Sequence, residues 1–340
     1  MWSRSIVLVC LTLGACTRSP WRTTKTWHVE RALEAGEKLG GCAAGDVMPE
    51  MPGPELVTVA ASGAVWVAWR EGGSWRSERV FSAPGEMIQV ACGEVLKASP
   101  GDEIVVVGMA SGRESSAGPG AAWLISRSGG MWKASQISKS PRLLHGVCVA
   151  REGVVVTGFE NNAQLIRFEG GEPKPGPIVS LPGAGKNGLQ VGNRVVIACA
   201  DGSLAAIDWS DNSVIAIDNR ASGRARLGSD GERIVVADDD GTLSIISPWG
   251  REEIYKESRK LRGAVLADVD PDVEGVEAVC AGYENKITIL RRTKNGWKSE
   301  LVHEEPDRLH HLLAVQLDGK DGLELVACGY AGALIVISRR

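Results

Sequence analysis

The chain has 340 residues, of which 42 are Gly and 44% are hydrophobic, and its formal net charge is -4 at pH 7. This length is compatible with one large all-β domain and does not require several domains. The acidic balance, with no Lys/Arg block beyond the N-terminus, argues against a nucleic-acid partner, because binding to phosphates needs concentrated basic charge.

The N-terminus reads "MWSRSIVLVCLTLGAC", with an apolar stretch from Ile6 to Leu13 that is too short to span a bilayer. Its ending resembles the lipobox of bacterial lipoproteins. This resemblance implies a signal peptide over residues 1–15, a lipid on Cys16 and a tether over residues 16–23. Thr17 favours the outer membrane over the inner membrane, since Asp is the inner-membrane retention residue at this position. The alternative is an ordinary secretory signal with a chance cysteine.

An internal repeat follows. Four segments share one register, and in each a Gly precedes a Glu by two positions and an apolar run comes next. The segments are "DVMPEMPGPELVTVAAS" from 46, "EVLKASPGDEIVVVG" from 94, "DVDPDVEGVEAVCAGY" from 268 and "QLDGKDGLELVACGY" from 316. We expect the repeated glutamates, Glu55, Glu103, Glu277 and Glu324, to mark strand starts rather than to act in catalysis.

The middle of the chain contains looser copies. "GVVVTGFENNAQLIRFE" from 153, "NRVVIACADGSLAAIDW" from 193 and "ERIVVADDDGTLSIIS" from 232 each place two apolar runs around a short Gly/Asn/Asp turn, which predicts a β-hairpin. Successive hairpins lie roughly 40 to 50 residues apart, the period of four-stranded propeller blades. The sequence therefore predicts seven such units.

The outer strand of several units carries Trp, as in "SWRSERVF", "MWKASQIS" and "GWKSELVH". The seventh unit ends before this strand, and "TWHVERAL" from 26 matches it at the other end of the chain. We therefore predict an all-β, seven-bladed β-propeller over residues 24–340, in which the N-terminal strand closes the last blade and removes an exposed sheet edge.

The segments "ADVDPDVEGVEAVCAGY" and "VQLDGKDGLELVACGY" resemble the FG-GAP/VCBS class of propeller repeats, found in integrin heads, bacterial surface proteins, lectins and polysaccharide lyases. "ADGSLAAID" and "DDDGTLSII" are more similar to hairpins of quinoprotein-type propellers, such as outer-membrane assembly lipoproteins. The first resemblance implies calcium as a cofactor, at a metal site of Asp268, Asp270 and Asp272. The alternative is a solvated turn whose carboxylates cap backbone N–H groups.

A second candidate site involves the starts of the inner strands. His145, Arg224, Arg262 and His310 are predicted to converge at one mouth of the central channel, where they could hold an anion or a sugar, or form a hydrated structural ring. By contrast, His28 and His303 lie on outer-strand patterns, and we expect both to be solvated.

Three further features allow two interpretations each. The repeated Trp residues either pack the outer strand against the neighbouring strand or stack on the rings of a bound sugar. The insertion Ala110 to Gly120 is a binding loop or a mobile connection. Cys42, Cys92 and Cys148 are small buried hydrophobes or include a disulfide.

Motifs for a nucleophile elbow, a phosphate loop, HExxH or a dinucleotide site are absent, and no catalytic residue is assigned. The leading interpretation is a non-enzymatic, lipid-anchored envelope protein whose propeller binds a protein partner or another ligand. The alternatives are a carbohydrate-binding or polysaccharide-cleaving propeller, with a glycan partner, and a calcium-stabilised adhesion module.

Overall fold

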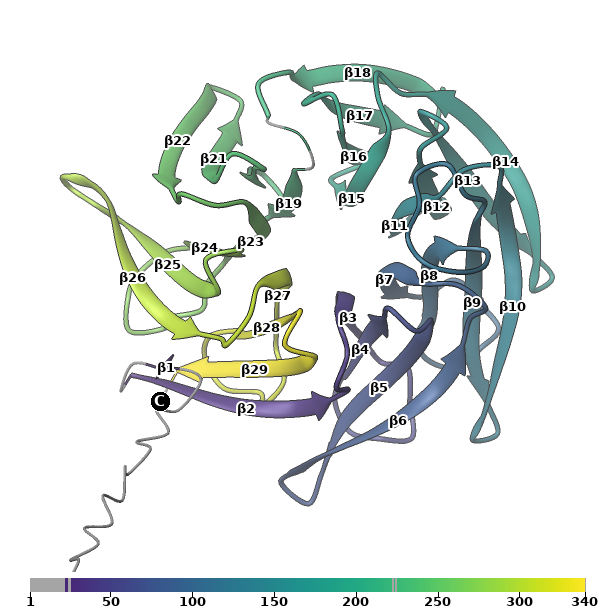
Figure 1. Cartoon of the computed structure of the whole chain (residues 1–340), viewed down its shortest axis with the longest axis horizontal. Helices are drawn as coiled ribbons and strands as arrows, with labels where there is room; N and C mark the ends of the chain where they lie inside the picture. Colours follow the sequence, from purple (N-terminus) through teal and green to yellow (C-terminus); the bar gives the residue numbers. More distant parts are fainter. Residues whose placement is uncertain (1–21, 24–25, 222, 224, 340) are drawn as a thin grey trace, which may run out of the picture.

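The computed structural model describes residues 22–23, 26–221, 223 and 225–339, and all regular structure in this part consists of β-strands. Seven antiparallel sheets, which we call blades, form a ring (Figure 1), and the first strand of each lines a central channel of about 450 Å³. Within the described residues no helix is long and apolar enough to cross a membrane. The predicted all-β, seven-bladed propeller is thus confirmed, whereas residues 1–15 and Cys16 lie outside the described part.

Each blade has four strands, ordered from the inner strand at the channel to the outer strand. Blade one consists of β3 (Leu39–Gly45), β4 (Glu55–Ala60), β5 (Ala64–Glu71) and β6 (Ser74–Ser82), and blade two of β7 (Met87–Gly93), β8 (Glu103–Met109), β9 (Gly120–Ser128) and β10 (Met131–Ser140). Blade three consists of β11 (Leu144–Ala150), β12 (Gly153–Gly158), β13 (Asn162–Glu169) and β14 (Glu172–Ser180), and blade four of β15 (Gly185–Val191), β16 (Arg194–Cys199), β17 (Leu204–Asp208) and β18 (Ser213–Asp218). Blade five consists of β19 (Arg226–Ser229), β20 (Ile234–Ala237), β21 (Thr242–Ser247) and β22 (Gly250–Lys256), and blade six of β23 (Leu261–Ala267), β24 (Glu277–Gly282), β25 (Lys286–Thr293) and β26 (Gly296–Glu304). Blade seven consists of β27 (Leu309–Val315), β28 (Glu324–Gly329), β29 (Ala333–Arg339) and β2 (Trp27–Glu34).

The N-terminal strand closes the ring as predicted. β2 pairs seven of its eight residues with β29, from Trp27 opposite Arg339 to Glu34 opposite Ala333. Because β2 is the outer strand of blade seven, the two ends of the chain share one sheet and hold the ring shut.

A short additional strand, β1 (Arg22–Thr23), pairs with the outer edge of β26 and gives blade six a fifth strand. Thr23 lies opposite His303, and the His303 side chain is fully buried, with Nε2 2.7 Å from a carboxylate oxygen of Glu305. The expectation that His303 is solvated was therefore wrong, while His28 is exposed as expected.

The hydrophobic core is divided among the contacts between blades. Val, Leu, Ile and Ala side chains of β4, β8, β12, β16, β20, β24 and β28 are almost all buried, because these strands have a neighbouring blade on each face. Seven apolar clusters result, each shared by two adjacent blades, including the cluster that joins blade seven to blade one across the closure. The ring therefore depends on every blade contact.

The repeated glutamates explain the shared register of the sequence. Each side chain is buried at the start of a second strand, and one carboxylate oxygen accepts a hydrogen bond from the backbone of the preceding loop. Glu103 accepts from both Val95 and Leu96, at 2.9 and 2.8 Å. Burial raises the pKa of all four carboxyl groups, in Glu55 to about 7, and the loop hydrogen bonds oppose that rise. These residues fix the loop between inner and second strands.

Candidate functional site

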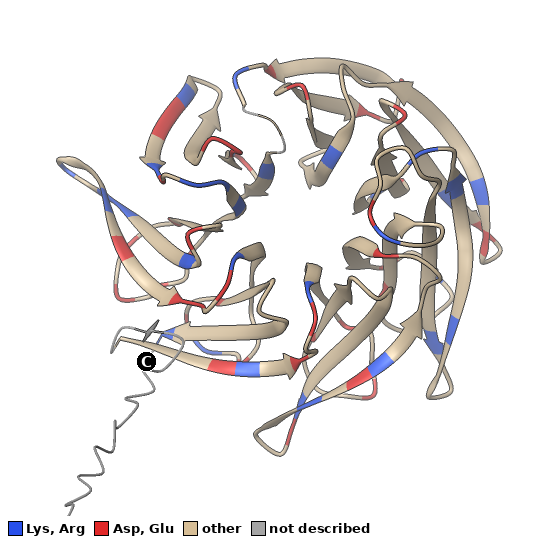
Figure 2. Ribbon diagram, in the orientation of Figure 1, with Lys and Arg blue, Asp and Glu red and all other residues tan. Residues whose placement is uncertain are grey.

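The mouth of the channel is built from the first residues of the inner strands. In blades three, four, six and seven, the second residue of the inner strand has no pairing partner on the adjacent strand. His145, Lys186, Arg262 and His310 therefore lie at β-bulges. A bulge re-aims its side chain, and bulges recur at barrel rims and binding sites. Arg226, the first residue of β19, occupies the same end of blade five. Figure 2 shows Lys and Arg on the inner strands of blades four, five and six.

The two histidines link neighbouring blades. His145 Nδ1 lies 2.9 Å from the carbonyl oxygen of Lys186, and His310 Nδ1 contacts the carbonyl oxygen of Gly40. Since a carbonyl only accepts, Nδ1 carries a proton in both rings. The inner strands are thereby connected around the mouth from blade three to four and from blade seven to one.

A cavity of about 60 Å³ lies at this mouth. Its lining includes three of the four predicted residues, His145, Arg262 and His310, whereas Arg224 lies outside the described residues. The other lining residues are Lys38, Gly40, Ile88, Glu114, Arg226, Tyr283 and Tyr330. The insertion between β8 and β9 supplies Glu114, whose carboxylate lies 3.7 Å from Lys38 Nζ.

The cavity wall joins aromatic and cationic side chains. The hydroxyl groups of Tyr283 and Tyr330 are 3.0 Å apart, and the two rings meet edge to face. The Arg308 guanidinium lies 3.8 Å from the centre of the Tyr330 ring, and that of Arg262 lies 5.2 Å from the Tyr283 ring. Arg262 also forms an ion pair with Asp239. Arg308 pairs with Asp307 at 3.2 Å and Lys38 with Glu86 at 2.8 Å, so carboxylates next to the cavity offset these cations.

Electrostatics at the mouth disfavour any additional proton. Burial lowers the pKa of His310 well below its usual value, and the nearby charges of Arg226, Lys38 and Arg262 lower it further. Burial and Arg226 also lower the pKa of His311, to about 4. Both imidazoles are therefore neutral at pH 7, and the positive charge of the mouth comes from Arg and Lys.

Sequence reasoning missed Lys38, Arg226 and the tyrosine pair. A signal existed for the tyrosines, because Gly282-Tyr283 and Gly329-Tyr330 recur in two units. Blade five is one of the looser copies, and this obscured the position of Arg226, two residues after the predicted Arg224. Lys38 directly precedes β3, as Lys260 and Arg308 precede β23 and β27, so a positional signal existed for it as well.

The acidic triplet occupies the loop between β23 and β24, on the opposite face. Asp270 is almost completely buried and pairs with Arg291 and with Arg339 Nε at 3.0 Å, while Asp272 lies 3.2 Å from another nitrogen of Arg339. In the part of the chain that the structure describes, no three His, Cys, Asp or Glu side chains form a group that could hold a metal. Calcium at Asp268, Asp270 and Asp272 stays a prediction.

The Trp residues of the outer strands pack against the blades, as the first interpretation predicted. Trp75, Trp132 and Trp297 contact three of the clusters between blades. Each faces an Arg on the adjacent strand, with the guanidinium 5.0, 5.0 and 5.4 Å from the ring centre. One face of every ring is therefore covered by a cation, which leaves less aromatic surface for a sugar.

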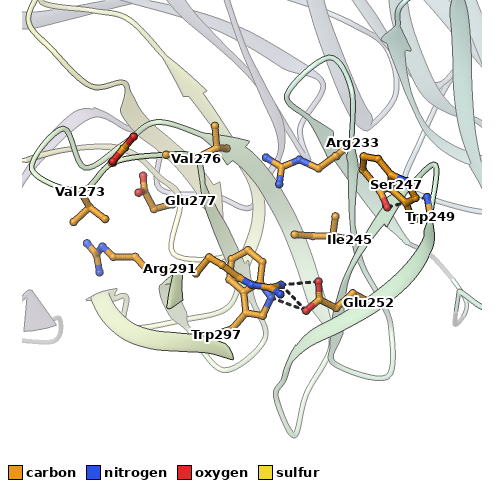
Figure 3. A pocket seen from close by; sticks show the side chains of 13 residues that line it. Arg233, Ile245, Ser247, Trp249, Glu252, Val273, Val276, Glu277, Arg291 and Trp297 are labelled. Atoms are coloured by element: carbon orange, nitrogen blue, oxygen red, sulfur yellow. Dashed lines mark hydrogen bonds and ion pairs between the residues drawn. The ribbon is translucent and has the colours of Figure 1, made fainter. Parts of the chain in front are cut away.

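A larger cleft, of about 560 Å³, opens between blades five and six on the face opposite the channel mouth (Figure 3). We call it the blade 5/6 groove. Its apolar part comprises Ile245, Val273, Val276, Trp249 and Trp297. Trp249, at the turn between β21 and β22, is 90% exposed, the highest value among the exposed large hydrophobic residues that the structure describes. Sequence reasoning did not identify this groove.

Most charged residues of the groove have hydrogen-bond or ion-pair partners. Arg292 donates to both carboxylate oxygens of Glu252, at 2.7 and 2.8 Å, and the Trp297 indole donates to the same carboxylate at 3.1 Å. Arg233 pairs with Asp230 at 2.6 Å and keeps 36% of its side chain exposed. The groove therefore combines an apolar centre with a rim of neutralised charge, the arrangement typical of protein interfaces.

No family model matches the chain, and no curated protein matches it either. Among solved structures the chain is similar to the WD40 beta propeller domain of Doa1, with a TM-score of 0.68 and 11% identity over 92% of this chain and 97% of that one. Similarity at this identity supports the propeller fold alone. The resemblance to FG-GAP/VCBS repeats stays a prediction.

Proposed function

We propose that the protein is a non-enzymatic propeller scaffold of the bacterial envelope, anchored by a lipid on Cys16, that docks a partner protein in the blade 5/6 groove. The observation that carries the docking site is Trp249, a large aromatic side chain left 90% exposed beside a preformed cleft. Trp and Arg are the residue types most enriched among those that dominate binding energy in protein interfaces.

The groove selects for one kind of partner segment. Ile245, Val276 and the ring of Trp249 offer an apolar surface for an aliphatic or aromatic side chain. Arg233, at the edge, is exposed enough to bond a carboxylate of the same segment in addition to Asp230. The expected occupant is therefore a protein loop or terminus with an apolar residue next to an acidic one.

Site-specific photocrosslinking tests this docking site. A photoreactive residue in place of Trp249 is expected to trap one defined partner in cells, whereas the same residue in place of Met131 is not. Met131 is a matched control because it is also highly exposed, at 74%, and follows the corresponding hairpin of blade two. Identical adducts at both positions would contradict the proposal.

With the partner identified, Trp249→Ala is expected to weaken its binding by about tenfold or more, because truncating a central Trp costs about 2 kcal/mol or more. The free energy of unfolding should change by no more than about 0.5 kcal/mol, since the side chain is exposed. Full affinity in the Trp249→Ala variant would rule out the groove.

The lipid anchor has an independent test. Cys16→Ser is expected to abolish incorporation of labelled fatty acid and to move the protein from the membrane fraction to the soluble fraction, because the acyl chains supply the membrane affinity. Cys10→Ser, within the apolar stretch, is the control and should leave both unchanged. Equal labelling of wild type and Cys16→Ser would refute lipidation at this residue.

A further inference from the structure

Two cysteines approach each other across the closure of the ring. Cys42 lies on β3 in blade one, and Cys328 lies on β28 in blade seven, 286 positions later in the sequence. Both belong to the apolar cluster between these two blades, where their exposed fractions are 1% and 0%. All cysteines that the structure describes are free thiols. The fold therefore buries two thiols at the contact between the first blade and the last.

His311 lies between the two cysteines. Its Nδ1 is 3.4 Å from Cys42 Sγ, and it also accepts a hydrogen bond from the backbone nitrogen of Cys42 at 3.4 Å. In the ladder between β27 and β28, His311 is directly opposite Cys328. Residues opposite each other in an antiparallel pair have their side chains on one face of the sheet, with Cβ atoms about 4.5 to 5.5 Å apart. Cys328 therefore directs its thiol towards blade one, beside the imidazole that Cys42 contacts.

Cys42 also reaches the strand that carries Cys328. Its Sγ lies 3.9 Å from the carbonyl oxygen of Val326, two residues before Cys328 on β28. Burial raises the pKa of the Cys42 thiol well above its usual value, and a hydrogen bond with Cys328 and the charge of Cys328 raise it further. The two thiols are thus direct neighbours.

This pair differs from the other cysteines. In the part of the chain that the structure describes, no second cysteine is among the groups that shift the pKa values of Cys92, Cys148, Cys199 and Cys280. Among the same residues, no three His, Cys, Asp or Glu side chains form a group that could hold a metal ion. The Cys42–Cys328 pair is therefore suited to chemistry between two thiols.

We propose that Cys42 and Cys328 form a disulfide bond that joins blade one to blade seven when the chain folds in the presence of a small-molecule disulfide oxidant. The Cys42 thiolate attacks one sulfur of the oxidant and releases one small thiol, and the Cys328 thiolate then attacks Cys42 Sγ and releases the second. The two protons lost by the protein end on the two released thiols. Both sulfur atoms are buried in the closed ring, so the exchange takes place before these blades pack or when they separate transiently.

The bond would hold the ring shut covalently, in addition to the pairing of β2 with β29. A cross-link over so long a loop strongly restricts the unfolded chain and thereby stabilises the folded one. Oxidants of this kind act on exported proteins, which agrees with the proposed envelope location. The inference goes beyond the docking function and does not depend on the blade 5/6 groove.

Oxidation of the purified, reduced full chain tests this bond. The protein is incubated with oxidised glutathione in urea just below the unfolding midpoint, where the blades separate transiently, and the remaining thiols are then alkylated. Peptide mass spectrometry is expected to find Cys42 joined to Cys328 and the other described cysteines alkylated. Reduction should lower the melting temperature by roughly 5 °C. Alkylation of both Cys42 and Cys328 after this treatment would overturn the proposal, as would bonds from either one to other cysteines.

Cys280→Ala is the matched control, because Cys280 is also fully buried on the second strand of its blade, in blade six. This variant should keep the cross-link and the fall in melting temperature on reduction, whereas Cys328→Ala should lose both. Each comparison is between the oxidised and reduced forms of one variant, so the effect of the substitution itself on stability cancels. An equal fall in Cys328→Ala and in the wild type would contradict the assignment. Trp249→Ala should form the bond normally, which separates this test from that of the groove.

Discussion

Replacing Trp27 by alanine is expected to lower the free energy of unfolding by about 3 to 5 kcal/mol, the usual cost of truncating a fully buried aromatic side chain. Trp27 has no exposed surface and packs in the cluster between blades six and seven. It also begins β2, so the cavity left by the truncation lies in the blade that closes the ring. Urea denaturation followed by circular dichroism measures the change.

The neighbouring His28→Ala is the control for this experiment. His28 is the next residue on the same strand, and its side chain is exposed to solvent. The free energy of unfolding of His28→Ala should therefore stay within about 0.5 kcal/mol of the wild-type value. The indole nitrogen of Trp27 has no hydrogen-bond partner, so the expected loss comes from packing and from the Arg339 guanidinium, which lies 5.5 Å from the ring centre. Equal stability of the two variants would show that β2 contributes little to closure.

Glu103→Ala is expected to destabilise the protein by about 2 to 6 kcal/mol, because the two backbone N–H groups that Glu103 binds would be left without an acceptor, at about 1 to 3 kcal/mol each. Glu103→Gln keeps a carbonyl acceptor of the same length and should lose less. Denaturant titration at pH 7 compares the variants.

Glu94→Ala serves as the reference, since Glu94 belongs to the same loop region and its side chain is exposed. Its removal should cost no more than about 0.5 kcal/mol. If Glu103→Ala were as stable as Glu94→Ala, the repeated glutamate would not be the element that holds the loop, and the shared register would need another cause.

The fold could be predicted because one pattern of buried strand residues and turn residues recurs seven times along the chain. The spacing of Glu55, Glu103, Glu277 and Glu324 and the Gly/Asn/Asp turns predicted blades and their number, and the missing outer strand predicted the closure. β1 has no sequence signature, since two residues carry no periodicity, and the burial of His303 beside Glu305 and Arg31 involves a neighbouring blade, which the outer-strand pattern does not show.

The candidate sites were only partly predictable. His145, Arg262 and His310 could be placed at one mouth because blade symmetry superposes the starts of inner strands. Glu114 reaches the same cavity from an insertion, where position depends on loop conformation rather than on period. The exposure of Trp249 is likewise a property of how two blades meet, which no single repeat encodes.

The direction of β1 has a consequence for orientation at a membrane. β1 runs antiparallel to β26 beside its last residues, so the chain enters blade six from the side of the channel mouth. Six residue steps separate Cys16 from Arg22, and a fully extended chain covers at most about 20 Å in that number. A lipid on Cys16 would hold this rim of the propeller close to the bilayer, with the mouth on the membrane-proximal side. The blade 5/6 groove would then project away from the lipid surface, towards whatever the envelope places opposite it.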